Sequence, residues 1–228
     1  MYREPEAERS TAQKGLFAAA ALAYVAVVLV VDTLATRGVE VPFHWSVFRW
    51  RADGGFDAFK FVAWFLVPLA LVLPAMDWHY FGIKRWRRID WGVLGACVLV
   101  GAVAVLSIRL FPSLRSIYGS HADASPEAKW FFLSYSLVWT LSWVVGWEFM
   151  HRYVLLRPLS ELWPKYGWLI IPIYEGAYHL QKPLIEALGM FAASAVLTYW
   201  ALKRRNALLP FVAHLIIELE LRAFQLVV

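Results

Sequence analysis

The sequence predicts an all-α fold, a polytopic transmembrane helical bundle with about seven membrane helices. Of its 228 residues, 61% are hydrophobic, well above the roughly 45–50% that is usual for soluble domains. A helix that crosses a bilayer needs about 20 mostly apolar residues, and seven apolar stretches are candidates. They cover residues 16–35, 58–76, 91–111, 130–157, 167–181, 183–201 and 207–228.

The apolar stretches divide the chain into three parts. Residues 1–15 form a polar N-terminal tail, residues 16–128 hold accessory helices 1–3 with their loops, and residues 129–228 hold helices 4–7. The first apolar stretch is too long for a typical signal peptide and lacks a clear cleavage site. We therefore interpret it as a retained membrane span.

Basic residues gather in the short loops between these stretches and give the chain a formal charge of +5. Beside membrane spans, such residues set orientation and contact anionic lipid, so the expected partner is the bilayer and not nucleic acid. Placing residues 84–88 in the cytoplasm also puts Arg157, Lys165 and residues 203–205 there, because successive spans alternate. The sequence thus predicts a multi-pass protein of the cell membrane, with a cytoplasmic N-terminus and the C-terminus on the opposite side.

Ionisable residues inside the predicted helices are concentrated in the second half of the chain. At membrane depth such residues are costly and usually functional. Three pairs have i,i+4 spacing, so each pair shares one helix face, and a rise of ~1.5 Å per residue puts all three in the cytoplasmic half of the bilayer. Three helices are therefore expected to enclose a small polar chamber. The pairs are Glu148–Arg152, Glu175–His179 and His214–Glu218.

This set of side chains suits hydrolysis. One carboxylate could act as the base toward a water molecule while an imidazole stabilises the developing negative charge. Each pair also has a purely structural interpretation, as an ion pair or a polar contact between helices. Glu218 has a second i+4 partner in Arg222, and His151, three residues after Glu148, is better explained by helix packing.

The ordered set of residues resembles the CPBP family of intramembrane proteases, which comprises CAAX prenyl proteases and bacteriocin-processing enzymes and is also called Abi. The motifs of that family are Glu-Glu-x-x-x-Arg, Phe-x-x-x-His and His-x-x-x-Asn, on successive membrane helices. The resemblance covers roughly residues 130–220. The matching segments here run from Trp147 to Arg152, from Glu175 to His179 and from His214 to Glu218.

The resemblance implies a glutamate-type intramembrane endopeptidase that needs no metal and no cofactor. Its expected substrate is a membrane-associated or lipid-anchored protein or peptide that reaches the chamber from lipid or from the cytoplasmic face. In the family, the first Glu of the pair is regarded as the base that activates water, and this chain has Trp147 there. The predicted catalytic residues are Glu148, Arg152, Glu175, His179, His214 and Glu218.

Each motif departs from the family pattern, and the departures raise a rescue hypothesis. Glu175 replaces the family's Phe and Glu218 replaces its Asn. Either Glu148 or Glu175 could activate water in place of the missing base. Glu218 would have to be protonated to donate a hydrogen bond as Asn does, or else would orient His214.

Other function classes compete with hydrolysis. An inactive relative that binds partner proteins is supported by Trp147. A di-metal carboxylate enzyme is suggested by the i,i+3 spacing of Glu148 and His151, although only one such motif is present and Arg152 brings a positive charge close by. A transporter or proton relay would also use intramembrane Glu and His residues, but no inverted repeat supports it.

Overall fold

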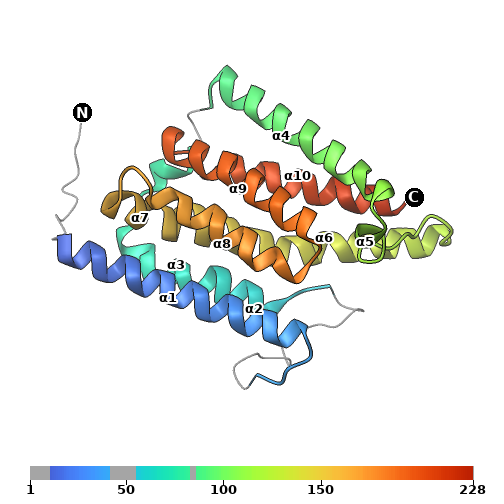
Figure 1. Ribbon diagram of the computed structural model, residues 1–228, viewed down its shortest axis with the longest axis horizontal. Coiled ribbons are helices and arrows are strands. Elements are labelled where there is room, and N and C mark those ends of the chain that lie inside the picture. The colour runs from blue at the N-terminus through green and yellow to red at the C-terminus, as the bar shows by residue number, and fades with distance from the viewer. Residues whose placement is uncertain (1–10, 42–54, 83–85, 228) are drawn as a thin grey trace.

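A computed structural model describes residues 11–41, 55–82 and 86–227. Two features of the sequence analysis lie partly outside the described residues, namely the first ten residues of the N-terminal tail and Lys84–Arg85 of the basic run. Within the described ranges the chain folds into helices and has no β-strand (Figure 1). The prediction of an all-α fold is confirmed.

The N-terminal half contains two long helical stretches and one interrupted stretch between them. The interrupted stretch begins where the Asp57 carboxylate accepts a hydrogen bond from the Lys60 amide, which caps its first turn. It then passes through a π-helical turn before Pro68. The elements are α1 (Thr11–Thr36), α2 (Ala58–Lys60), η2 (Phe61–Leu66), α3 (Val67–Val72), η3 (Leu73–Ala75), η4 (Trp78–Phe81), α4 (Arg88–Ser107), η5 (Ile108–Leu110) and α5 (Pro112–Arg115).

The C-terminal half begins with a long helix that contains a second π-helical turn. Ser125 caps this helix by accepting a hydrogen bond from the Ala128 amide, and Pro126 occupies its first position, where no amide hydrogen is needed. The elements are α6 (Pro126–Phe149), the π-helical turn η6 (Met150–Leu155), α7 (Leu156–Leu162), η7 (Gly167–Leu169), α8 (Ile170–Tyr178), η8 (His179–Gln181), α9 (Leu184–Arg204) and α10 (Leu208–Gln225).

Among the described residues, three helices are long and apolar enough to cross a membrane. They are Ala12–Thr36, Arg88–Leu110 and Leu184–Arg204, and a shorter apolar helix covers Ala58–Val72. The predicted count of seven spans is therefore not confirmed, although helices occur at all seven predicted stretches. The others fall short for physical reasons: α8 is only nine residues long, α6 is rich in Trp and Ser, and α10 carries three charged side chains near its end.

Close helix packing positions the C-terminal half around one interior. Helix α8 packs along α9, α10 packs against both α4 and α6, and η2 packs against α6 (Figure 1). Gly146 permits the last of these contacts, since a Cβ atom there would lie 2.7 Å from the Cβ of Trp64. The faces of α6, η6, α8 and α10 that carry the ionisable residues consequently meet.

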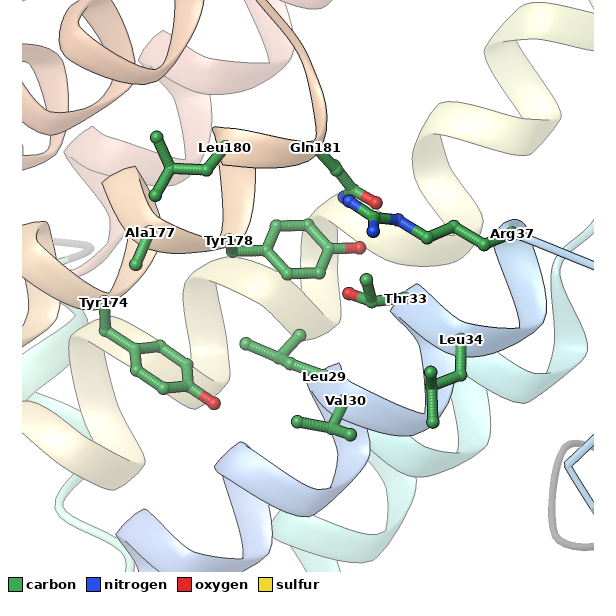
Figure 2. Close-up of a pocket in the computed structure, with 10 residues that line it drawn as sticks. All are labelled: Leu29, Val30, Thr33, Leu34, Arg37, Tyr174, Ala177, Tyr178, Leu180 and Gln181. Carbon is green, nitrogen blue, oxygen red and sulfur yellow. The ribbon is translucent and has the colours of Figure 1, made fainter. Parts of the chain in front are cut away.

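Two grooves open beside α1. One lies between the C-terminal end of α1 and α8 and has a volume of about 330 Å³ (Figure 2). The other lies between the N-terminal part of α1 and α3 and has a volume of about 610 Å³. The first groove contains an arginine, Arg37, whereas the residues that line the second are all uncharged.

Candidate functional site

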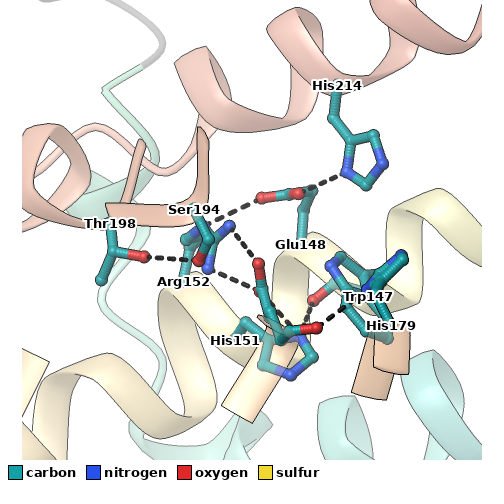
Figure 3. Close-up of polar contacts among 9 residues, drawn as sticks. Trp147, Glu148, His151, Arg152, His179, Ser194, Thr198 and His214 are labelled. Carbon is teal, nitrogen blue, oxygen red and sulfur yellow. Dashed lines mark hydrogen bonds and ion pairs between the residues drawn. The ribbon is translucent and has the colours of Figure 1, made fainter. Parts of the chain in front are cut away.

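A buried polar cluster lies where α6, η6, α8 and α10 meet (Figure 3). Glu148 of α6, Arg152 of η6 and Glu175 of α8 are each 1–2% exposed, and His214 of α10 contacts Glu148. These four residues are called the Arg152 cluster below. Its members come from three helical segments separated by 23 to 66 residues in the sequence.

Arg152 connects the two carboxylates of this cluster. Its Nη1 donates to Glu175 Oε1 over 2.7 Å and its Nη2 donates to Glu175 Oε2 over 3.0 Å, which is the two-pronged geometry that favours arginine–carboxylate pairs. Its Nε lies 3.2 Å from Glu148 Oε2. One guanidinium thus partners two carboxylates, and the three groups together carry one excess negative charge.

His214 approaches the cluster through Glu148. Its Nδ1 lies 2.6 Å from Glu148 Oε1, so Nδ1 carries a proton that it donates to the carboxylate. The His214 side chain is 12% exposed, compared with 2% for Glu148. Imidazole Nε2 is therefore the ring nitrogen that can meet another group from the more accessible side of the cluster.

Two further histidines bond to backbone carbonyls of their own helices. His179 Nδ1 is 2.8 Å from the carbonyl oxygen of Glu175, and His151 Nδ1 is 2.8 Å from that of Trp147. A carbonyl oxygen only accepts, so both histidines donate from Nδ1, and in the neutral form Nε2 carries a lone pair. His151 is completely buried and lies 3.5 Å from Glu175 Oε1, closer to the Arg152 cluster than its packing interpretation suggested.

Trp147 occupies the position where the resemblance expects a catalytic Glu. Its ring centroid lies 4.4 Å from that of His151, 5.2 Å from that of Tyr178 and 5.3 Å from that of Trp64. The side chain is 2% exposed, and its indole nitrogen has no hydrogen-bond partner among the described residues. An indole can only donate a proton in a hydrogen bond, so this position cannot supply the base.

Glu218 takes the second of the two partners that its spacing allows. Its Oε2 accepts a hydrogen bond from Arg222 Nη2 over 3.1 Å, one turn further along α10. Of the six predicted catalytic residues, direct contacts thus join Glu148, Arg152, Glu175 and His214. His179 lies beside Trp147, with ring centroids 6.0 Å apart, and Glu218 pairs along its own helix.

Sequence reasoning missed a polar contact from α9. Ser194 of α9 lies beside the Glu175 carboxylate, and its hydroxyl is 3.5 Å from that of Thr198, one turn away (Figure 3). Both side chains are buried. The i,i+4 spacing of two small hydroxyl residues in an otherwise apolar helix was the available signal, and it points to a polar helix neighbour.

A second buried polar cluster lies among the N-terminal helices. Lys60 Nζ is 3.6 Å from Asp32 Oδ2 and 3.8 Å from Asp57 Oδ2, and all three residues are buried. These residues are called the Lys60 cluster below. The Tyr178 hydroxyl donates to Asp32 Oδ2 over 2.7 Å, which ties α1 to α8. The accessory helices therefore contact the C-terminal half through buried polar groups.

The geometry does not favour the di-metal interpretation. Within the part of the chain that the structure describes, no group of three His, Cys, Asp or Glu side chains is arranged to hold a metal ion. Both carboxylates that would have to be ligands instead face the guanidinium of Arg152. A cation in the same place would meet that positive charge directly.

Comparison with known families identifies the segment that carries the Arg152 cluster. Residues 128–219 match the family of type II CAAX prenyl endopeptidase Rce1-like proteins, a segment that contains all six predicted catalytic residues. No significant match was found among curated proteins or among solved structures. The match confirms the CPBP resemblance. Residues 128–219 are therefore similar to the Rce1-like CAAX prenyl endopeptidase family, within the CPBP family, and this match together with the apolar helices indicates a membrane protein.

Proposed function

We propose that the protein is an intramembrane endopeptidase that hydrolyses a peptide bond of a membrane-associated or lipid-anchored protein. The observation that carries this proposal is the Arg152 cluster, which lies inside the segment matched by the family. Two carboxylates, a guanidinium and an imidazole in a buried site provide both a proton acceptor and hydrogen-bond donors for a developing oxyanion.

Glu148 is the better candidate for the base. Both oxygens of Glu175 accept hydrogen bonds from Arg152, and His151 Nδ1 lies 3.5 Å from Oε1, so the lone pairs of Glu175 are largely occupied. Glu148 accepts one hydrogen bond, from His214, and its Oε2 faces Arg152 Nε at 3.2 Å as an ion pair but accepts no hydrogen bond among the described residues. Glu175 then serves as a positioning residue, because it fixes Arg152 beside Glu148.

Charge balance supports a role for His214 as the oxyanion donor. The two carboxylates and Arg152 leave one excess negative charge, and buried charges are stable only when they are paired. A protonated His214 neutralises the cluster and donates from Nε2 as well as from Nδ1. His179, on the neighbouring helix, is the second imidazole that we assign to substrate or water positioning.

In the proposed reaction, the oxygen of a water molecule attacks the scissile carbonyl carbon while Glu148 takes one of its protons. The carbonyl electron pair moves to oxygen, and the resulting oxyanion accepts a hydrogen bond from His214. The intermediate then collapses, the C–N bond breaks, and the proton held by Glu148 passes to the departing amine. The products are a carboxylate and an amine, and no metal or cofactor takes part.

The proposal includes the membrane arrangement expected from the sequence. Seven helical stretches enter or cross the cell membrane, with the tail 1–15 in the cytoplasm, accessory helices in 16–128, the CPBP-like core in 129–228 and the C-terminus on the opposite side. Two ion pairs support this arrangement, because each joins two segments that it places on the cytoplasmic side. Lys14 lies 3.5 Å from Glu161 of α7, and Arg205 lies 3.2 Å from Asp77.

The decisive test compares Glu148→Gln with the wild-type chain in cells that express either at the same level. Mass spectrometry of membrane-protein termini should detect new termini with the wild type. Loss of a general base lowers the rate roughly 10²- to 10⁴-fold, so these termini should nearly disappear with the variant. Glu161→Gln, an exposed position on α7, is the matched control and should process normally. Equal processing by wild type and Glu148→Gln would overturn the mechanism.

A second candidate function is supported by Trp147, namely an inactive relative that binds membrane segments or partner proteins without turnover. The packed indole excludes a carboxylate from the place where the family has its base. This candidate predicts that the wild-type chain yields no new termini, whereas Trp147→Glu creates cleavage. Cleavage by the wild-type chain that depends on Glu148 would exclude it.

A further inference from the structure

The groove between α1 and α8 combines an apolar floor with a polar end. Its floor is lined by Leu29, Val30 and Leu180, and its end holds Arg37 and Gln181. Figure 2 shows the Arg37 side chain reaching from α1 toward Gln181 across the mouth of the groove. A ligand that fits must therefore join a hydrocarbon portion to a group that accepts hydrogen bonds.

The charge at the polar end is positive. None of the ten residues that line the groove has a carboxylate, and Arg37 is exposed. Asp32, which lies near Arg37 in the sequence, already accepts from Tyr178 and faces Lys60. The polar end thus favours an anionic group, and the planar guanidinium suits a phosphate.

The position of Arg37 matches the height of lipid headgroups. Helix α1 is 26 residues long, or ~39 Å at 1.5 Å per residue, which exceeds the ~30 Å hydrocarbon core of a bilayer. Arg37 follows the last helical residue, so its long side chain lies at the membrane–water interface. The groove below it faces the acyl region.

We propose that this groove binds one anionic phospholipid, with its phosphate at Arg37 and part of one acyl chain along Leu29, Val30 and Leu180. The volume of about 330 Å³ equals that of roughly ten water molecules, which is enough for a segment of a single chain and too small for a whole lipid. The second groove serves as an internal contrast: it is larger, yet none of its lining residues is charged. The proposal is independent of hydrolysis and depends only on the membrane placement of α1.

The bound chain would lie against the wall of the candidate site. Tyr178 lines the groove, and its ring centroid is 5.2 Å from that of Trp147 and 5.5 Å from that of His179. A single aromatic ring therefore separates the lipid groove from residues beside the Arg152 cluster.

The test counts lipids that stay bound to the purified full-length chain, using native mass spectrometry in an uncharged detergent. Phosphatidylglycerol should bind more tightly than phosphatidylcholine, and Arg37→Gln should weaken phosphatidylglycerol binding about fivefold, as expected from about 1 kcal/mol for a basic side chain at a lipid surface. Arg115→Gln removes an equal charge from an exposed position outside the groove and should have no effect. Equal effects of the two variants, or equal binding of the two lipids, would overturn the proposal.

A photoreactive phosphatidylglycerol with its reactive group on the acyl chain then locates the site. Labelling is expected within residues 29–37 and 174–181, whereas labelling confined to the second groove would contradict the assignment. An apolar peptide with a free C-terminal carboxylate provides the competing occupant. If that peptide binds through Arg37 while phosphatidylglycerol does not, the groove is a peptide site and the lipid assignment is wrong.

Discussion

The Arg152 cluster and the Lys60 cluster have the same basic composition, two buried carboxylates that share one cation. Their geometry differs. Arg152 grips Glu175 through two hydrogen bonds of 2.7 and 3.0 Å, whereas Lys60 lies 3.6 and 3.8 Å from its two partners. Their neighbours differ as well. In the Arg152 cluster the imidazole of His214 contacts Glu148, whereas the rings of Trp64 and Trp139 and the Tyr178 hydroxyl surround the Lys60 cluster.

This difference supports the proposal that the Arg152 cluster is reactive and that the Lys60 cluster is structural. Imidazole is the side chain whose ordinary pKa lies closest to neutral, so it can exchange protons under physiological conditions. The phenol and indole groups around Lys60 supply hydrogen bonds and cation–π contacts but no comparable proton exchange. A buried charge in a membrane protein is thus insufficient evidence for a catalytic site. The groups that contact the charge must also be able to exchange protons.

The largest expected effect is the loss of Arg152. Arg152→Met leaves Glu148 and Glu175 buried without their cation, and breaking such a pair typically costs about 3–5 kcal/mol. The free energy of unfolding in mild detergent should fall by that amount, and cleavage should be lost. A triple variant that also carries Glu148→Gln and Glu175→Gln should recover most of the stability but no activity. A loss below about 1 kcal/mol for Arg152→Met would contradict the tight pairing.

A smaller effect is expected at the matching position of the other cluster. Lys60→Met should lower the free energy of unfolding by about 1–3 kcal/mol, because its ion pairs are longer and less well formed. Cleavage per folded molecule should be preserved, since the Arg152 cluster keeps its contacts. A loss of cleavage as large as that caused by Glu148→Gln would show that the Lys60 cluster belongs to the reactive site.

The smallest effect concerns a polar group outside the spans. The Tyr118 hydroxyl donates to Glu186 and accepts from Lys182, and burial raises the pKa of Tyr118 to about 12. Between pH 10 and 12 the unfolded tyrosine loses a proton that the folded one keeps, so stability should fall as pH rises through this window. Tyr118→Phe should make the decline in unfolding midpoint less steep. Tyr166→Phe, at an exposed position, should not change the slope.

The sequence was sufficient to place the helices because apolar runs and helix caps are local signals. All seven predicted stretches are helical, with boundaries such as 183–201 for α9 at Leu184–Arg204. The sequence was not sufficient to predict the number of membrane spans. Charged residues lower the apolar character of α10, and α8 is only nine residues long. Whether these two helices enter the bilayer depends on packing that composition does not describe.

The sequence predicted which helices would bring their polar residues together, but not which side chains would pair. The i,i+4 spacing assigned Arg152 to Glu148, and the structure adds the stronger pairing with Glu175 on another helix. Spacing also left Glu218 with two choices, and the structure pairs it with Arg222, while His214 bonds to Glu148 on another helix. Asp32 and Lys60 were overlooked because they stand near the ends of apolar stretches, where exposure is the usual outcome.

The π-helical turn at Met150–Leu155 sets the rotation between two parts of one continuous helix, the part that carries Glu148 and the part that forms α7. A π-turn contains one residue more than an α-turn, and all six residues of this turn are buried. Removing one residue there would rotate everything beyond it by about 100° relative to Glu148. Glu148 would still face His214, while the residues of α7 turned away from their neighbours. The number of residues in this turn is consequently constrained. Relatives should tolerate substitutions in the turn far more readily than insertions or deletions.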